Sequence, residues 1–176
     1  MNKTTETMKD ICINLLKNRG VNISDIVDIV YDLQKKYVPD LTREVCEDAI
    51  QRVLGKREVQ NAILTGIELD VLAEKNMLSE PLQSLISKDN PLYGIDEILV
   101  LSICNVYGSI GLTNFGYVDK IKPGIIGKLD KIGKSTNKCH TFMDDIIGAI
   151  SAAAASSVAH NAEEWLNCFL GIYNRK

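Results

Sequence analysis

Hydrophobic residues recur along most of the chain at intervals of three and four positions, the spacing of an amphipathic α-helix. The first stripe runs from Met8 to Leu16 and stops at Arg19-Gly20, where glycine suits a helix C-terminus. Ser24 predicts the N-cap of the next helix, and Thr42 or Asp40 that of the third. Period-2 alternation is not sustained, so the predicted fold class is all-α. The predicted helices cover about 8–19, 24–38, 42–55, 57–75, a short segment after Pro81, 95–107, 109–119 and 141–170.

The last predicted helix begins at Thr141 and is built largely of glycine, alanine and serine from Gly148 to Ala159. Small side chains let neighbouring backbones approach closely, which is expected of a helix enclosed by others. The pattern therefore predicts a single multihelical domain over residues 1–176, with this small-residue helix at its centre.

The segment from Ile98 to Val118 carries no charged residue and has about the length of a membrane-spanning helix. Asn105, Asn114 and three glycines interrupt it, and polar groups in hydrocarbon need internal partners. The sequence favours two buried or half-buried helices that break near Gly108, and it leaves peripheral contact with a bilayer open. The two asparagines need hydrogen-bond partners, because an unpaired buried polar group costs roughly 1 to 3 kcal/mol.

Composition narrows the class of protein. The chain has 176 residues and is 45% hydrophobic, which is enough to bury the core of one domain. Its net charge of -3 argues against binding to nucleic acid, which needs an excess of positive charge. The polar start, Met1 to Lys9, is unlike a signal peptide and predicts a cytoplasmic protein. The cysteines form no CxxC pair and are expected to be core residues; they are Cys12, Cys46, Cys104, Cys139 and Cys168.

Two acidic pairs stand where a polar helix start meets an apolar segment: Asp144-Asp145 and Asp96-Glu97. One interpretation is structural, since Thr141 and Asp144 fit a capping box and acids favour the first turn of a helix. The other is functional, because two such helix ends brought together would offer oxygen ligands to Mg²⁺. Adjacent helical residues diverge by about 100°, so one ligand from each pair is expected.

Other residues lie near these pairs in the sequence. Asp119 and Asp130 add acids to the segment that joins them, and Glu68 is expected to point inward, whereas Asp70 is expected on a solvated face with Glu74. His140 precedes the predicted cap and would relay a proton or donate to a phosphate oxygen; an ordinary loop histidine is the alternative.

The ordered acidic segments resemble those of the phosphatidylglycerophosphatase A family. The matching segments are Ile95-Asp96-Glu97-Ile98, Val118-Asp119-Lys120-Ile121-Lys122-Pro123, Leu129-Asp130 and Met143-Asp144-Asp145-Ile146-Ile147-Gly148-Ala149. Within that family the chain is similar to the soluble branch that has the YutG-like multihelical fold and includes the low-temperature requirement C protein. The N-terminal Gly-Pro-Gly-Thr-type segment of the integral-membrane members is not found in residues 1–60.

The resemblance implies Mg²⁺-dependent hydrolysis of phosphatidylglycerophosphate to phosphatidylglycerol and phosphate. Four acids would be catalytic: Asp96, Glu97, Asp144 and Asp145. The same four would bind metal together with Glu68 and Asp119, while the groups expected to bind substrate are Lys122, Asn105, Asn114 and His140.

Two alternatives stay open from the residues alone. One is a soluble phosphatase or pyrophosphatase that acts on a small phosphorylated molecule. The other is a non-catalytic helical interaction protein linked to growth at low temperature. The predicted partner is a phosphorylated lipid or small phosphorylated molecule, and exposed amphipathic helices leave room for a homo-oligomer.

Overall fold

The structure, a computed structural model, describes residues 6–135 and 137–169, and all regular elements in these ranges are helical. The prediction of an all-α, single-domain fold is confirmed. The elements are α1 (Met8–Asn18), α2 (Ile23–Gln34), α3 (Arg43–Leu54), α4 (Arg57–Glu74), α5 (Leu82–Ser87), α6 (Ile95–Cys104), the 3₁₀ turn η1 (Asn105–Tyr107), α7 (Gly108–Ile121), α8 (Ile125–Ser135) and α9 (Met143–Phe169).

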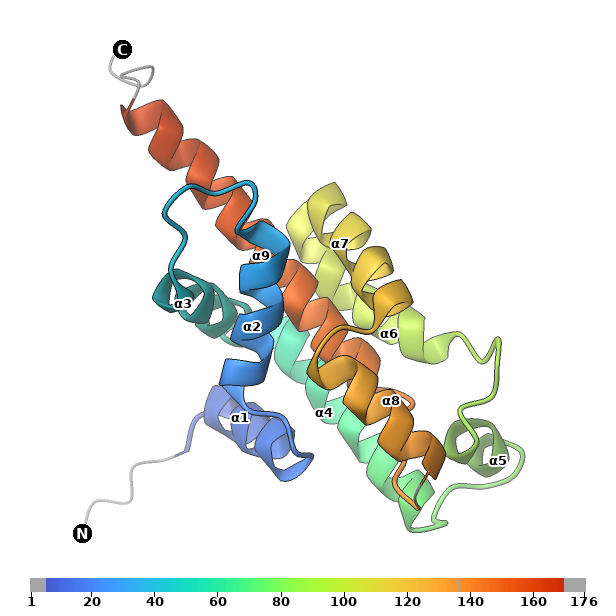
Figure 1. The fold of residues 1–176 in the computed structure, drawn as a ribbon. Coiled ribbons are helices and arrows are strands. Elements are labelled where there is room, and N and C mark those ends of the chain that lie inside the picture. Colours follow the sequence, from blue (N-terminus) through green and yellow to red (C-terminus); the bar gives the residue numbers. More distant parts are fainter. Residues whose placement is uncertain (1–5, 136, 170–176) are drawn as a thin grey trace, which may run out of the picture.

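Helix α9 is the centre of the fold, as its small residues predict. It runs through the molecule and contacts α2, α3, α4, α6, α7 and α8 (Figure 1). Its residues from Met143 to Ser156 are buried without interruption. The serines in this run need internal partners: Ser151 donates to the carbonyl of Ile147 at 2.8 Å, and Ser156 to the carbonyl of Tyr107 at 2.8 Å.

The first three helices begin at residues able to cap them. Thr7 forms a capping box with Asp10, and the hydroxyl of Thr42 accepts the amide of Val45, which confirms Thr42 rather than Asp40 as the cap. The prediction of Ser24 is wrong, because the second helix starts at Ile23 and its capping box joins Asn22 to Asp25. Asparagine serves this position as well as serine does.

Helices α6 and α7 form a hairpin on α9. Gly108, with φ 67° and ψ -159°, separates them, which confirms the predicted break. Tyr107 at the turn lies against Ser156, whereas the space beside Gly148, near the start of α9, is filled by Phe115 and Val118. The first turn of α6 and the last turn of α7 therefore both lie beside the start of α9 (Figure 1).

The segment Ile95–Ile121 is long and apolar enough to cross a membrane by length and composition alone, and 28% of an 18-residue apolar stretch within it is buried. Its outward side is thus more exposed than the prediction of buried or half-buried helices implies. Four of the five cysteines are buried and unpaired, as expected; Cys168 lies outside the residues whose side chains the structure describes.

Gly66 in α4 allows a close approach between α4, α6 and α9. A Cβ atom at this position would lie 2.7 Å from Cδ1 of Ile146, 3.0 Å from Cβ of Phe142 and 3.3 Å from Cδ2 of Leu99. Nothing lies within 4 Å of the equivalent position at Gly116 on α7. The two glycines therefore have different roles although both are helical.

We expect Gly66→Ala to lower the free energy of unfolding by about 1 to 3 kcal/mol, because it overpacks a contact of three helices. Gly116→Ala, the matched control, should raise it by about 0.5 to 1 kcal/mol. Alanine gives the unfolded chain fewer backbone conformations than glycine does, so less conformational entropy is lost on folding. Urea unfolding of both variants measures the difference. Equal effects at the two sites would contradict the close approach at Gly66.

Candidate active site at the start of helix α9

The first amides of α9 are capped by a residue of another helix, α4. The Asp70 carboxylate of α4 accepts the amide of Phe142 at 3.1 Å and that of Met143 at 3.0 Å, and the thiol of Cys139 lies 3.5 Å from the same group. The predicted local capping box is wrong, because the hydroxyl of Thr141 donates to the carbonyl of Ile86 at 2.7 Å instead. The carboxylate of Asp144 is thereby released from a capping role.

Asp144 and Asp145 meet a lysine ammonium. Nζ of Lys122 lies 2.8 Å from Oδ2 of Asp144, 3.7 Å from Oδ1 of Asp145 and 2.7 Å from Oδ1 of Asp119. Lys122 is the C-cap of α7 and has a left-handed backbone, with φ 45°. The hairpin thus brings the predicted Lys122 and Asp119 to the acidic pair.

Burial dominates the electrostatics of the pair. Removal from water raises the pKa of Asp144, although Lys122 opposes the rise, and it raises the pKa of Asp145 together with the neighbouring charge of Asp144. Burial lowers the pKa of the Lys122 ammonium, but the carboxylates of Asp144 and Asp119 outweigh it and hold that pKa above its usual value. Four ionised groups would carry three negative charges and one positive, so the cluster favours additional positive charge.

Of the second predicted pair, one member lies near enough to this cluster to act on it electrostatically. Asp96 lies in the first turn of α6, is half-buried and adds a negative charge that raises the pKa of Asp145. Glu97 is exposed on the other side of the turn. Successive helical side chains point about 100° apart, which explains the division. A role for Glu97 stays a prediction.

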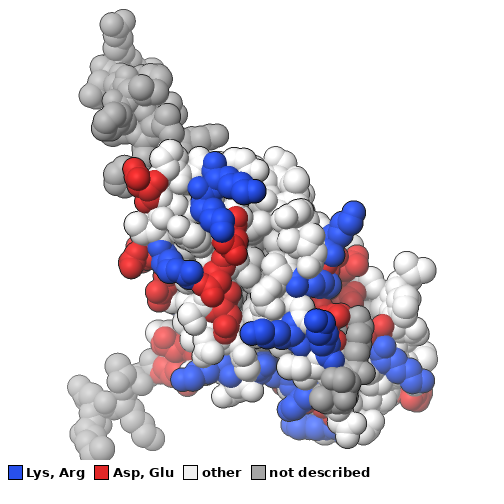
Figure 2. Space-filling view, viewed as in Figure 1, with Lys and Arg blue, Asp and Glu red and all other residues white. Residues whose placement is uncertain are grey.

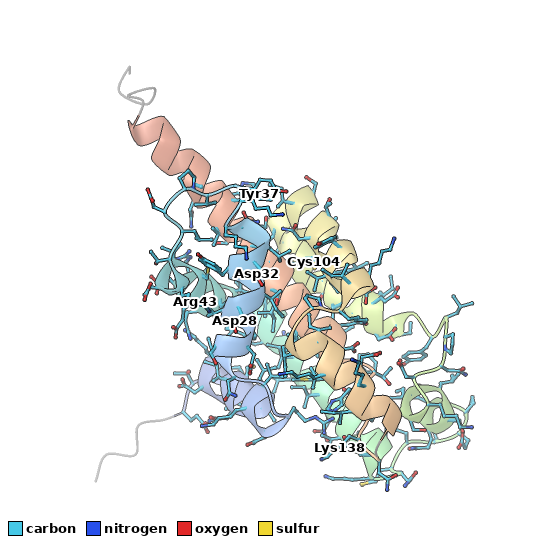
Figure 3. All side chains as sticks on the ribbon, in the orientation of Figure 1. Asp28, Asp32, Tyr37, Arg43, Cys104 and Lys138 are labelled. Carbon is cyan, nitrogen blue, oxygen red and sulfur yellow. The ribbon has the colours of Figure 1, made fainter. Side chains whose placement is uncertain are left out.

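A pocket opens beside Asp144, with a volume of about 370 Å³. Charged and polar groups line much of it, contributed by Lys88, Asp89, Asp130, Lys138, His140 and Asp144. Asp130 was a sequence candidate, and its charge raises the pKa of Asp144, as does that of Asp89. Figure 3 shows Lys138 near the far end of α8, where its ammonium lies 3.7 Å from Oε2 of Glu74.

His140 is a buried pocket residue and not an ordinary loop side chain. Nη2 of Arg19 lies 3.2 Å from its Nδ1 and also donates to the carbonyl of Cys139. Because arginine has no acceptor, Nδ1 must accept and the ring proton resides on Nε2. Burial and the charge of Arg19 lower the pKa of His140 to about 4, so it is neutral at pH 7. It can donate one hydrogen bond, but it cannot supply a positive charge there.

Arg19 and Glu74 hold the loop that leads into α9. Their side chains pair at 2.8 Å, and Glu74 accepts the amide of Cys139 at 2.9 Å. Burial alone would raise the pKa of Glu74, but the hydrogen bond and charge of Arg19 bring it below its usual value. This pair and the cap from Asp70 fix the position of residues 139–143.

The expectations for the two α4 acids are reversed. Asp70 is fully buried, whereas Glu68 is exposed and does not point inward. The sequence pattern did place Asp70 and Glu74 on one side of α4, but that side faces the loop before α9 and not solvent. Their spacing of four residues was the available signal; the partners on residues 139–143 were not visible locally.

The two asparagines also differ from expectation. Asn105 in η1 is exposed, so it needs no protein partner. Asn114 in α7 is half-buried, and its Nδ2 is buried without a hydrogen bond among the described residues. Within the described residues the amide nitrogen of Asn114 thus lacks the partner that the sequence analysis expected.

The donors at this site suit a divalent cation in type and charge. Carboxylate oxygens are the ligands that Mg²⁺ takes from proteins, and buried carboxylates with raised pKa values favour an added cation. In residues 6–135 and 137–169, however, no three His, Cys, Asp or Glu side chains stand close enough together to hold a metal as arranged. Lys122 occupies the space between the carboxylates, so a cation would have to displace its ammonium.

Burial raises the pKa of Asp70 to about 7. Between roughly pH 4 and 7 the folded chain retains a proton that the unfolded chain has lost, so this group makes the free energy of unfolding fall as pH rises; above that window its contribution is constant. Asp70→Asn should remove up to about 1.4 kcal/mol per pH unit of that slope, as measured by urea unfolding at several pH values. The exposed Asp48→Asn is the control. An unchanged slope in Asp70→Asn would contradict a protonated buried carboxyl.

A family model described as Phosphatidylglycerophosphatase A matches residues 13–160. YutG of Bacillus subtilis is 63% identical over 147 residues, which are 84% of this chain and 87% of YutG. MJ1330 of Methanocaldococcus jannaschii is 30% identical over 120 residues, 68% of this chain and 87% of the relative.

Solved structures agree with the sequence relatives. The low temperature requirement C protein from Listeria monocytogenes has a TM-score of 0.86 and 54% identity, and the match covers 90% of this chain and 99% of that one. The ypjQ protein of Bacillus subtilis has a TM-score of 0.84 and 56% identity, and the match covers 90% and 96%. The resemblance in the acidic segments is thereby confirmed over most of the chain. The chain belongs to the phosphatidylglycerophosphatase A family.

Proposed function

We propose that this protein is a Mg²⁺-dependent phosphatase that converts phosphatidylglycerophosphate to phosphatidylglycerol and inorganic phosphate. Family membership supports a phosphatase-like role at a coarse level. The reaction adds water across the phosphorus–oxygen ester bond: the phosphate gains the oxygen of water, and the departing alcohol gains a proton. The substrate and the metal dependence are the finer parts of the proposal.

The observation that carries the proposal is the buried acidic pair beside a polar pocket. Asp144 is 7% exposed and lines a pocket with a volume of about 370 Å³, and the adjacent Asp145 is 5% exposed. Buried carboxylates are costly unless they are paired, protonated or bound to a cation. A fold that keeps two of them next to an open pocket does so at a cost in stability, which is typical of functional sites.

The chain's own groups would divide the work. Asp144 and Asp145, with Asp96 and Asp119, would hold Mg²⁺, which would neutralise charge on the phosphoryl oxygens. Once displaced from the acids, the ammonium of Lys122 would bind a phosphate oxygen as a point charge. Nε2–H of His140 would donate a second hydrogen bond from the pocket wall. These contacts would hold and orient the phosphate.

The second candidate is a phosphatase of a small, water-soluble phosphate ester. The charged lining of the pocket favours it, because lysine, aspartate and histidine side chains would accept a polar molecule as readily as a lipid head group. Phosphate release from phosphatidylglycerophosphate in detergent, measured beside glycerol phosphate and nucleotides, separates the two. Turnover of the soluble esters alone would replace the lipid substrate with this one.

Asp144→Asn and Asp145→Asn should each lower phosphate release by about 100-fold or more, the scale of a positioned catalytic group. Each should also reduce the rise in melting temperature that Mg²⁺ produces, because a ligand that binds only the folded state stabilises it. Asp48→Asn on α3 is the matched control, since it removes an exposed carboxylate far from the cluster in sequence. If Mg²⁺ does not raise the melting temperature of the unaltered protein, the metal dependence is wrong.

The two members of the α6 pair should differ. Asp96→Asn should reduce phosphate release by about 10-fold or more, because this carboxylate acts on Asp145, whereas the exposed Glu97 should matter less. Parallel kinetics of Asp96→Asn and Glu97→Gln test the division. A larger loss in Glu97→Gln would show that the first turn of α6 presents its other carboxylate to the substrate.

A further inference from the structure

We propose that the outward face of the α6–η1–α7 hairpin binds the surface of a lipid bilayer and sets the acidic site at the edge of that contact. The proposal rests on the proposed function for the choice of a lipid substrate, but the binding itself requires no catalysis. The face is defined by Ile95, Ile98, Val106, Leu112, Tyr117 and Ile121, all of which are exposed.

The apolar face is unusual for a surface in water. Ile98 is 63% exposed, Tyr117 55% and Ile121 48%, and each belongs to the same hairpin. No charged residue occurs between Ile98 and Val118. Figure 2 shows lysine, arginine, aspartate and glutamate gathered over α2, α3 and the region of α8, while the surface over the first turns of α7 is white. Several large apolar side chains exposed on one hairpin are more than isolated surface hydrophobics, and such a surface marks an interaction site.

Two exposed hydroxyl groups of the hairpin are satisfied within their own helices. The exposed Ser102 donates to the carbonyl of Leu99 at 2.6 Å, and the exposed Thr113 donates to that of Ser109 at 2.8 Å. In an apolar medium every polar group must find an internal partner. A hydroxyl bonded to its own helix can therefore lie against hydrocarbon at small cost, and it has no donor left to offer a protein partner.

The hairpin geometry limits how the face meets a membrane. The inner side is fixed to α9 through Phe115, Val118 and Tyr107, and the chain reverses at Gly108. The two helices cannot extend into a single span without leaving α9. The contact is therefore shallow and lies in the plane of the membrane, as in amphipathic interfacial helices.

The position of the catalytic groups favours a bilayer over a second copy of the chain. Ile95 and Ile98 flank Asp96, and Ile121 immediately precedes Lys122, so the apolar face continues up to the acidic site. A second protein copy seated there would cover this end of the site, whereas a bilayer would bring phosphate groups to it. Tyr117 and the exposed Lys120 lie at the same end, and both residue types are favoured at the boundary between water and lipid.

Leu92 extends the face at this end. It is fully exposed in the loop before α6 and has a left-handed backbone with φ 66°. A large apolar side chain in that conformation is uncommon. Its position just before Ile95 fits a side chain that enters the lipid beside the site.

Flotation of the full chain with vesicles tests the proposal, using phosphatidylcholine alone and a mixture with phosphatidylglycerol. The unaltered protein should float with both and stay bound at high salt, because the contact is apolar and screening does not weaken it. The double variant Ile98→Glu/Leu112→Glu should lose about 10-fold or more of its binding, since a charge in the membrane is costly. Tyr37→Glu/Met77→Glu, which alters exposed apolar residues outside the hairpin, is the matched control and should bind as the unaltered protein does.

Three results would overturn docking on lipid: no flotation of the unaltered protein, equal loss in the control variant, or a dimer in size-exclusion chromatography that only the hairpin variant disrupts while vesicles capture nothing. Melting temperatures confirm that both double variants are folded. Release of phosphate from a soluble ester reports on the acidic site alone. If the protein floats with vesicles but releases phosphate from no ester, membrane docking is supported and the proposed reaction is wrong. If it releases phosphate but does not float, the reaction is supported and docking is wrong.

Discussion

The cap that Asp70 provides to the first turn of α9 is the constraint on which the site depends. Helix N-termini usually take their caps from neighbouring residues, and the sequence offers one in Thr141 and Asp144. Here α4 supplies the acceptor, and Asp70 lies 72 positions before Phe142 in the sequence. Since Asp70 already accepts the first amides, the carboxylate of Asp144 can line the pocket, and both Asp144 and Asp145 can lie beside Lys122 and need not fold back on their own helix.

The second constraint is the charge that this arrangement buries. Protonation, the ammonium of Lys122 and a bound cation are three ways to relieve the same repulsion among Asp119, Asp144 and Asp145. These three compete, because a proton, an ammonium or a cation at the carboxylates reduces the negative charge that would attract the other two. Binding of a metal cation at the site should therefore depend on pH and on the position of the Lys122 ammonium.

Sequence reasoning was reliable where one helix determines the answer. The small residues of α9 predicted its central place, and Gly108 the break in the apolar segment. It failed where two helices decide together. The exposed Glu68 and the buried Asp70 differ by two positions on α4, and only the docking of the loop at 139–143 shows which of them faces inward. The convergence of Asp96 and Lys122 on α9 was predictable in outline from the ordered acidic segments, but the tie between Arg19, Glu74 and His140 joins residues too far apart for any local pattern.

At Lys122 the side chain is needed at the site although the backbone conformation is unfavourable for lysine. It ends α7 with a left-handed backbone conformation, which glycine and asparagine adopt readily. For most other residues this conformation costs about 1 kcal/mol of stability. A search for stabilising substitutions would select this position early and replace the lysine with glycine. That exchange would relieve about 1 kcal/mol of backbone strain, but it would remove the ammonium that contacts Asp119, Asp144 and Asp145, and the loss of that charge beside buried carboxylates costs more than the relief. The unfavourable backbone at Lys122 is therefore kept because the charge of its side chain stabilises the carboxylates around it.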